Sequence, residues 1–173
     1  MKTSRWLLYP FCLPWALTMS YPGVYLMVLL RLAKNPEWKS FGVLVATWSD
    51  WVCSWWRYST TMGSAVIFNK EHRGVRQIEQ HEGVHVRQYE DNCFIGFLIA
   101  ALHVFVFHGH WAAGLFIWWS AGSWQLISYL TAGFRWGFGQ RTMYYGAEHE
   151  RAAYAETVSV GDGKLWEDTY GVK

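Results

Sequence analysis

The stretch QHEGVHVRQY occupies positions 80–89 and places two histidines four residues apart. Side chains at this spacing lie on one face of a helix, so His81 and His85 can bind one tetrahedral ion together. Glu82 follows the first histidine, where it can take a proton from a water molecule beside that ion. Val75 and Ile78 continue this face upstream, so that the series 75, 78, 81 and 85 has spacings of three and four, as in a helix. The stretch therefore predicts a metal-binding helix of the HExxH type.

Two protein ligands do not complete such a site, because catalytic zinc usually has three and keeps a fourth position open. The segment EHERAAY at positions 148–154 offers carboxylates, and its alanines are strong helix formers. Glu148, Glu150 and, further along, Glu156 are the candidates for a third ligand.

The segment between the two motifs, from Asn92 to Phe134, contains 43 residues and no Asp, Glu, Lys or Arg. A polar, glycine-containing stretch at 108–110 interrupts it, which predicts a helical hairpin with arms at 93–107 and 112–133. A chain of this size has too little other surface to bury such a hairpin, so we expect it to enter a membrane. The histidines of the turn are expected to cap it, with a second metal site as the alternative.

A second gap in charge, residues 6–30, would extend roughly 37 Å as a helix, against about 30 Å for a bilayer core. Prolines interrupt it, so it is either a kinked anchor or two pieces lying in the membrane interface. A cleaved signal peptide is the alternative, although small residues are missing from the cleavage position. The Trp-rich stretch 41–56 is expected to be interfacial or to pack against the other helices.

These elements predict a mainly α, membrane-associated protein with an apolar helical hairpin, 93–133, between two motif helices. A short β edge strand is expected near residues 65–69, because an apolar run there precedes the motif. The predicted organisation is an N-terminal anchor or interfacial region (1–56), a zincin-like unit (57–157) and an exposed tail (158–173).

Composition excludes other classes of protein. The chain is 52% hydrophobic, 19% aromatic and 16% charged, so it is not intrinsically disordered. Its net charge of +2 does not favour nucleic acid as a partner. The three cysteines lie far apart and form no CxxC pair, which argues against both a disulfide framework and a cysteine-based zinc site. Many Trp and Tyr side chains suit a membrane–water interface.

The order HExxHxRQ at 81–88, an apolar hairpin and ERxAY at 150–154 resembles a group of small bacterial and phage proteins described as metallopeptidases. More distantly, it is similar to membrane gluzincins, the heat-shock membrane peptidases and the prenyl-protein proteases. The resemblance covers roughly residues 63–157. The chain departs from the group at His149, where an aromatic residue is common, and at Ala152, where an acid is common; neither is an expected ligand.

The resemblance implies a zinc metallopeptidase, a hydrolase of the gluzincin type that cleaves peptide bonds. It selects Glu150 over Glu148 and Glu156 as the third zinc ligand beside the two histidines. Glu82 is then the expected general base. Tyr154 lies one helical turn past Glu150 and is expected to orient a ligand or to stabilise the oxyanion, with Tyr144 and Tyr145 as alternatives.

Basic residues flank the hairpin on both sides, whereas its turn has no Lys or Arg. Because short flanks rich in Lys and Arg stay cytoplasmic, we expect an inner-membrane protein with its zinc site on the cytoplasmic face. Its expected partners are the lipid bilayer and a peptide or protein substrate. Two other functions are a non-enzymatic membrane protein with a structural zinc site that binds a partner, and a pore-forming protein. The second leaves both motifs unexplained.

Overall fold

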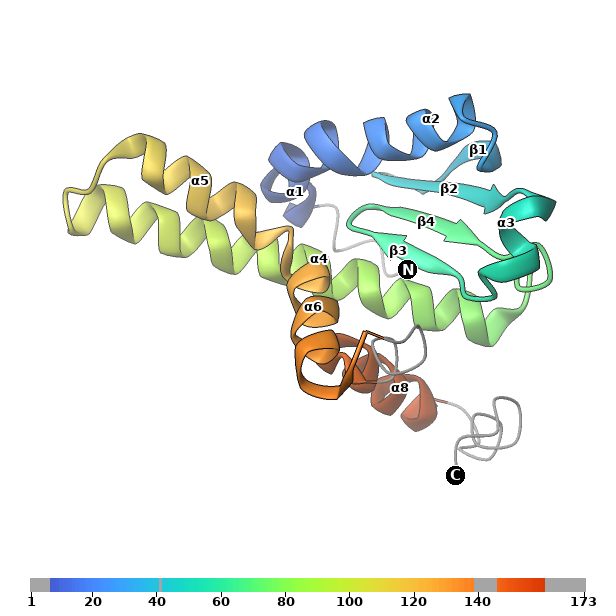
Figure 1. The fold of residues 1–173 in the computed structure, drawn as a ribbon. Coiled ribbons are helices and arrows are strands. Elements are labelled where there is room, and N and C mark those ends of the chain that lie inside the picture. The colour runs from blue at the N-terminus through green and yellow to red at the C-terminus, as the bar shows by residue number, and fades with distance from the viewer. Residues whose placement is uncertain (1–6, 41, 139–145, 161–173) are drawn as a thin grey trace.

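A four-stranded mixed sheet with helices on both faces forms the body of the protein (Figure 1). The computed structural model describes residues 7–40, 42–138 and 146–160, and the side chains of all of these except 40, 136 and 156–160. The strands are β1 (Ala33–Ser40), β2 (Val43–Trp48), β3 (Thr60–Met62) and β4 (Ala65–Phe68), in the spatial order β1-β2-β4-β3. β2 and β4 are parallel, and the two outer pairs are antiparallel.

The strand predicted near residues 65–69 is present as β4, but the prediction that it is an edge strand was wrong. β4 lies between β2 and β3, and all four of its residues are buried. An unbroken apolar run is typical of a strand covered on both faces, whereas an edge strand is usually shorter or more polar. The edge strand next to β4 is β3, whose three residues, TTM, are half-buried.

Alternate residues of β2 and β4 pack into two separate cores. Leu44, Ala46 and Ile67 pack with Val24 of the helix α2 (Tyr21–Leu29) on one face. On the other face, Val43, Val45, Val66 and Phe68 pack with Val86 of the helix α4 (Arg76–Ala101). The sheet therefore fixes the position of α4, the helix that contains the HExxH motif.

The stretch 41–56, predicted to be interfacial or to pack against the other helices, contributes to the core of the body in its described part, 42–56. It contains the fully buried strand β2 and the short helix α3 (Asp50–Trp55), which Ser49 caps through its side chain. β2 pairs with β4, so the sheet connects the predicted N-terminal region to the predicted zincin-like unit across residue 56.

The N-terminal charge gap is helical throughout its described part. It consists of α1 (Tyr9–Trp15), a π-helical turn η2 (Ala16–Ser20) and α2. Near its start, Phe11 packs on Phe97 of α4 with ring centroids 4.8 Å apart. The carbonyl of Phe11 also accepts a hydrogen bond from Trp118 Nε1 at 2.8 Å. This helical run therefore covers the sheet at one end and supports the base of the hairpin at the other.

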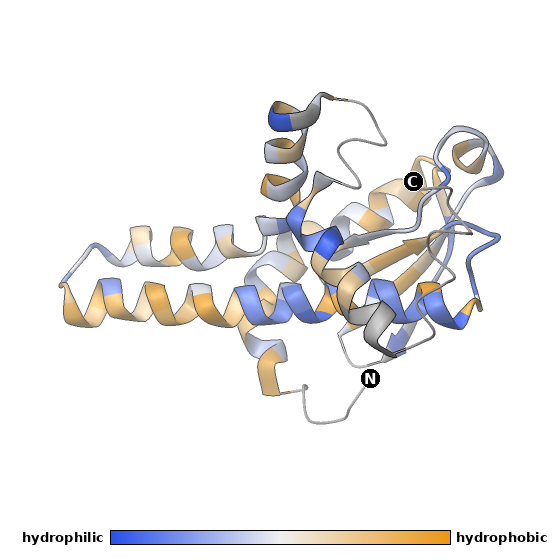
Figure 2. Cartoon of the chain, turned by 90° about the horizontal axis from the view of Figure 1, so that it is seen from below, coloured by the Kyte–Doolittle hydropathy of each residue, from blue (hydrophilic) through white to orange (hydrophobic). Residues whose placement is uncertain are grey.

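The predicted hairpin exists, but its second arm is shorter than expected. α4 continues through the π-helical segment η3 (Leu102–Val106) as the first arm, and α5 (Trp111–Ala121) is the second. These arms project from the body, and the hydropathy of α4 changes from polar to apolar along its length (Figures 1 and 2). Gly96 lets the arms approach closely, since a Cβ there would lie 2.3 Å from the Cβ of Ala121.

After α5 the chain turns away from the hairpin into α6 (Trp124–Trp136), which contacts α4 and α8 (Glu148–Val160). The part of the predicted tail from residue 161 onward lies outside the described residues. Two helical runs, Tyr9–Leu29 and Arg76–Val106, are long and apolar enough to cross a membrane by length and composition.

Candidate metal centre

The first half of α4 brings the two motif histidines under the sheet. His81 and His85 are 1% and 2% exposed, although both are polar. Their helix has a polar first half followed by an apolar second half, so the histidines lie outside the apolar arm that begins at Cys93. Val86 anchors this part of α4 to the sheet. The predicted helix and the common face of the two imidazoles are confirmed.

Glu150 of α8 meets both histidines, 65 or more residues away in the sequence. Its Oε2 atom lies 3.1 Å from His81 Nε2 and 3.1 Å from His85 Nε2. The two Nε2 atoms are 3.2 Å apart, and one donor atom from each residue lies within 4.8 Å of the others. Among the described residues, this is the one group of three or more potential ligands that could hold a metal ion.

The competing carboxylates differ in position. Glu148 is exposed, whereas Glu150 is 1% exposed and faces the histidines. The side chain of Glu156 lies outside the described residues. Two imidazole nitrogens and a carboxylate oxygen are the donor set of a catalytic zinc site.

The buried charges of the site also fit a cation. Burial opposes ionisation of Glu150, but its hydrogen bonds with His81 and His85 outweigh this and hold its pKa well below the usual value. Burial likewise lowers the pKa of His85, while the hydrogen bond and charge of Glu150 raise it, to about 9 overall. Without a metal ion, a proton on His85 therefore balances the Glu150 carboxylate. A metal ion would take over this role from the proton.

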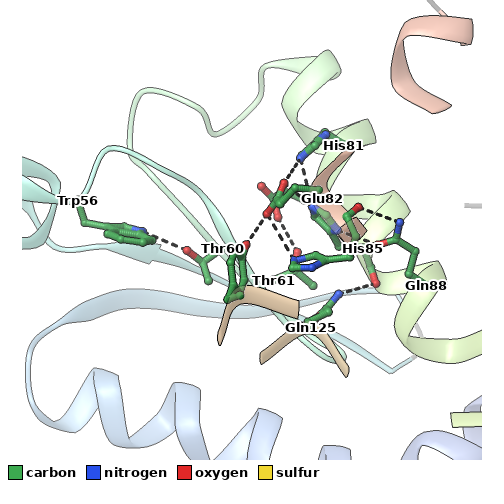
Figure 3. A network of polar contacts seen from close by, with 11 residues as sticks. Trp56, Thr60, Thr61, His81, Glu82, His85, Gln88 and Gln125 are labelled. Carbon is green, nitrogen blue, oxygen red and sulfur yellow. Dashed lines mark hydrogen bonds and ion pairs between the residues drawn. The ribbon is translucent and has the colours of Figure 1, made fainter. Parts of the chain in front are cut away.

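Two glutamines hold His85 in place (Figure 3). His85 Nδ1 lies 2.9 Å from Gln88 Oε1, an acceptor, so Nδ1 carries a proton in both the neutral and the charged imidazole, and Nε2 faces Glu150. Gln88 Nε2 donates to the carbonyl of His149 at 3.1 Å, which connects α4 to the start of α8. Gln125 of α6 donates to the main-chain carbonyl of His85 at 3.0 Å. Such partners orient a ligand and fix its tautomer.

Tyr129 of α6 is a site residue that the sequence interpretation missed. Its hydroxyl donates a hydrogen bond to Glu150 Oε1, and its ring packs on His149 with centroids 4.5 Å apart. Burial raises the pKa of Tyr129 well above its usual value, so the phenol stays protonated. A signal was available, since Gln125, Ser128 and Tyr129 recur at helical spacing in an otherwise apolar segment.

Glu82, the expected general base, is beside the ligands but points toward the sheet edge. Thr61 of β3 donates to its Oε2 at 2.5 Å (Figure 3). Glu82 is 2% exposed, and burial raises the pKa of its carboxyl. Thr61 was not predicted, because no motif marks it.

Tyr154 also reaches the centre, where its ring lies against His81 with centroids 4.5 Å apart. The alternatives Tyr144 and Tyr145 lie outside the described residues.

The histidines of the hairpin turn do not reach the centre. His110 Nδ1 accepts from the main-chain N–H of Ala112 at 3.2 Å and caps α5.

Comparisons with protein-family models, with curated proteins and with solved structures give no match for this chain.

Proposed function

We propose that the protein is a membrane-associated zinc metallopeptidase that hydrolyses peptide bonds. The observation that carries the proposal is the buried His81–His85–Glu150 group, with a fourth buried residue, Glu82, next to it. The three donors match catalytic zinc better than they match Mg²⁺ or Ca²⁺, which prefer oxygen ligands. A separate carboxylate beside the ligands is what a hydrolytic site requires for proton transfer.

When bound, zinc supplies a Lewis acid that polarises a carbonyl and makes water more acidic. Glu82 accepts the proton of the attacking water and returns it to the leaving amine. Burial raises the pKa of its carboxyl above the ordinary value, which favours uptake of the proton. Thr61 holds Oε2 of Glu82, so the carboxylate keeps one orientation during the transfer.

The edge strand β3 supports a peptide as the substrate. β3 is the last strand of the sheet, and its Thr61 contacts Glu82. An extended peptide can add to such an edge through main-chain hydrogen bonds. A peptide paired with β3 would pass close to the general base.

The apolar hairpin supports membrane attachment, and the positions of the basic residues support the cytoplasmic face. The most exposed apolar residues of the hairpin are at its end: Phe105 is 78% exposed and Phe107 is 76% exposed. The polar half of α4 and α8 lie on the opposite side from this end. We therefore place the site next to the inner membrane, on the side of its Lys and Arg flanks.

Zinc content and hydrolysis by detergent-purified protein test the proposal. Wild-type protein should hold about one zinc per chain and cleave members of a quenched fluorescent peptide library. Glu82→Gln should keep the zinc and lose the cleavage, whereas His81→Ala should lose both. Zinc below about 0.2 per chain in the wild type, or equal cleavage by Glu82→Gln, would contradict it.

A structural zinc site in a non-enzymatic, partner-binding membrane protein is the second candidate. It is favoured by the burial of all three ligands, none of which is more than 2% exposed. Under this function, Glu82→Gln would hold zinc and leave partner binding unchanged.

A further inference from the structure

The two oxygens of the Glu150 carboxylate have different surroundings. Oε2 lies 3.1 Å from the Nε2 atom of each motif histidine. Oε1 accepts the hydrogen bond of Tyr129, and His149 Nε2 lies 3.7 Å from it. A hydrogen bond from a hydroxyl to a carboxylate is short and strong, so it holds the plane of the carboxylate in one orientation.

We propose that Tyr129 is a positioning residue that makes Glu150 a one-oxygen ligand of the metal ion. The inference rests on the proposed metal centre. While Oε1 is engaged by the phenol, only Oε2 is directed at the ion. A carboxylate that supplied both oxygens would occupy the coordination position that a catalytic site keeps open.

The placement of α6 supports this role. Gln125 and Tyr129 are one helical turn apart and bind different ligand helices, Gln125 through the carbonyl of His85 and Tyr129 through Glu150. Ala132, the next residue on this face, is 3% exposed and completes the buried stripe. α6 therefore holds both ligand helices with polar contacts, although it lies within a segment that has no charged residue before Arg135.

Tyr89 provides a matched control, because it is also a buried tyrosine on a helix near the site. It is 1% exposed, and its hydroxyl donates to the main-chain carbonyl of Cys12 at 2.8 Å. Tyr89→Phe removes a buried hydroxyl without touching a metal ligand. Tyr129→Phe removes the hydroxyl that binds Glu150 and keeps the ring that packs on His149.

Two measurements on the full-length protein in detergent separate positioning from packing. Zinc affinity, measured by chelator competition, should fall about 10- to 100-fold in Tyr129→Phe and stay within about twofold in Tyr89→Phe. In the Co²⁺-loaded protein, the visible absorption of Tyr129→Phe should weaken, since the second carboxylate oxygen raises the coordination number. The spectrum of Tyr89→Phe should match the wild type.

Unchanged zinc affinity and an unchanged Co²⁺ spectrum in Tyr129→Phe would overturn the inference. If that variant does not fold, the crystal structure of the zinc-loaded wild-type protein decides, and a Glu150 carboxylate with both oxygens bonded to zinc would overturn the inference. Wild-type protein that binds no zinc would refute the proposed metal centre itself. A third outcome would refute only the role of Tyr129: the wild-type protein binds zinc, His81→Ala abolishes this binding, and Tyr129→Phe changes neither the zinc affinity nor the Co²⁺ spectrum.

Discussion

At the scale of single residues, the site places a carboxylate and a protonated imidazole in contact and out of water. Glu150 and His85 are each at most 2% exposed, and each stabilises the charged form of the other. Such a pair is costly to bury unless further hydrogen bonds complete it. Gln88 and Tyr129 supply these bonds, one for each member of the pair. These four side chains therefore hold one another in place.

The choice of the third ligand yields a first prediction. Glu150→Ala should lower zinc affinity by at least about 100-fold, because the centre loses its one anionic ligand. Glu148→Ala should leave affinity unchanged, since Glu148 is exposed and two residues away on the helix. Chelator competition on both purified variants measures the difference. Loss of zinc in Glu148→Ala with retention in Glu150→Ala would mean that the wrong carboxylate has been assigned.

The raised pKa of His85 yields a second prediction, on pH. In the folded, metal-free protein this pKa is about 9, above the roughly 6.5 of an unfolded chain. The proton therefore stabilises the metal-free fold fully below about pH 6.5, and this contribution is lost as the pH rises through 9. Zinc must displace the proton, so its affinity should rise about tenfold per unit between pH 7 and 8 and level off above pH 9.

Calorimetry in two buffers of different ionisation enthalpy measures the proton released when zinc binds. About one proton per zinc is expected at pH 7, where His85 is still charged. Zinc affinity that is flat from pH 7 to 9 would show that His85 is already neutral in the metal-free protein.

Much of the site could be predicted from the sequence at this scale, because its ligands occur in short motifs with helical spacing. His81, His85 and Glu150 were all predicted, and all three meet. Tyr129 and Thr61 were not predicted, since each comes from an element that contains no recognised motif. Spacing within one helix shows which side chains share a face, but not which distant residue that face will meet.

At the scale of elements, the helices could be predicted and the sheet largely could not. β2 is buried along its whole length, so it lacks the alternation by which strands are recognised and looks like a membrane segment. β1 contains Pro36 and has two register shifts against β2. A proline in an apolar or extended run usually argues against a strand, because it has no N–H for the sheet. Pro36 is tolerated because β1 is at the edge of the sheet.

Two glycines of α4 yield a third prediction, on stability. A Cβ at Gly96 would lie 2.3 Å from the Cβ of Ala121, whereas no atom lies within 4 Å of one at Gly83. Gly96→Val should therefore destabilise the packing of α4 on α5 by about 1–3 kcal/mol. Gly83→Ala should stabilise the helix by up to about 1 kcal/mol, because glycine is a poor helix former. The midpoint temperature of unfolding in detergent should fall for Gly96→Val and rise for Gly83→Ala. Equal midpoints would contradict the close approach of the hairpin arms at Gly96.

At the scale of the whole molecule, the body and the hairpin face different surroundings. Sheet, α3 and the polar half of α4 form one end, and the apolar arms form the other (Figure 2). Across the charge gap, α4 and η3 continue as a helix from Asn92 to Val106, 15 residues or roughly 22 Å. α5 has 11 residues, or roughly 17 Å. Both lengths are shorter than the about 30 Å of a bilayer core, so the folded hairpin should enter the membrane without crossing it.

This geometry yields the fourth prediction, on accessibility to an impermeant thiol reagent, in a protein without its three native cysteines. Cysteine should be placed at Phe107, which is 76% exposed at the hairpin turn, and at Glu71, which is exposed in the turn before α4. Both positions avoid the glycines of these turns: a Cβ at Gly109 would lie 2.2 Å from the ring of His103, and Gly74 has a φ of +85°. On intact cells, neither cysteine should react. After permeabilisation, only the cysteine at position 71 should react, because the bilayer covers the hairpin end and protects position 107. Reaction at Phe107 on intact cells would show that the turn reaches the far side, and reaction at Glu71 would place the metal centre outside the cytoplasm.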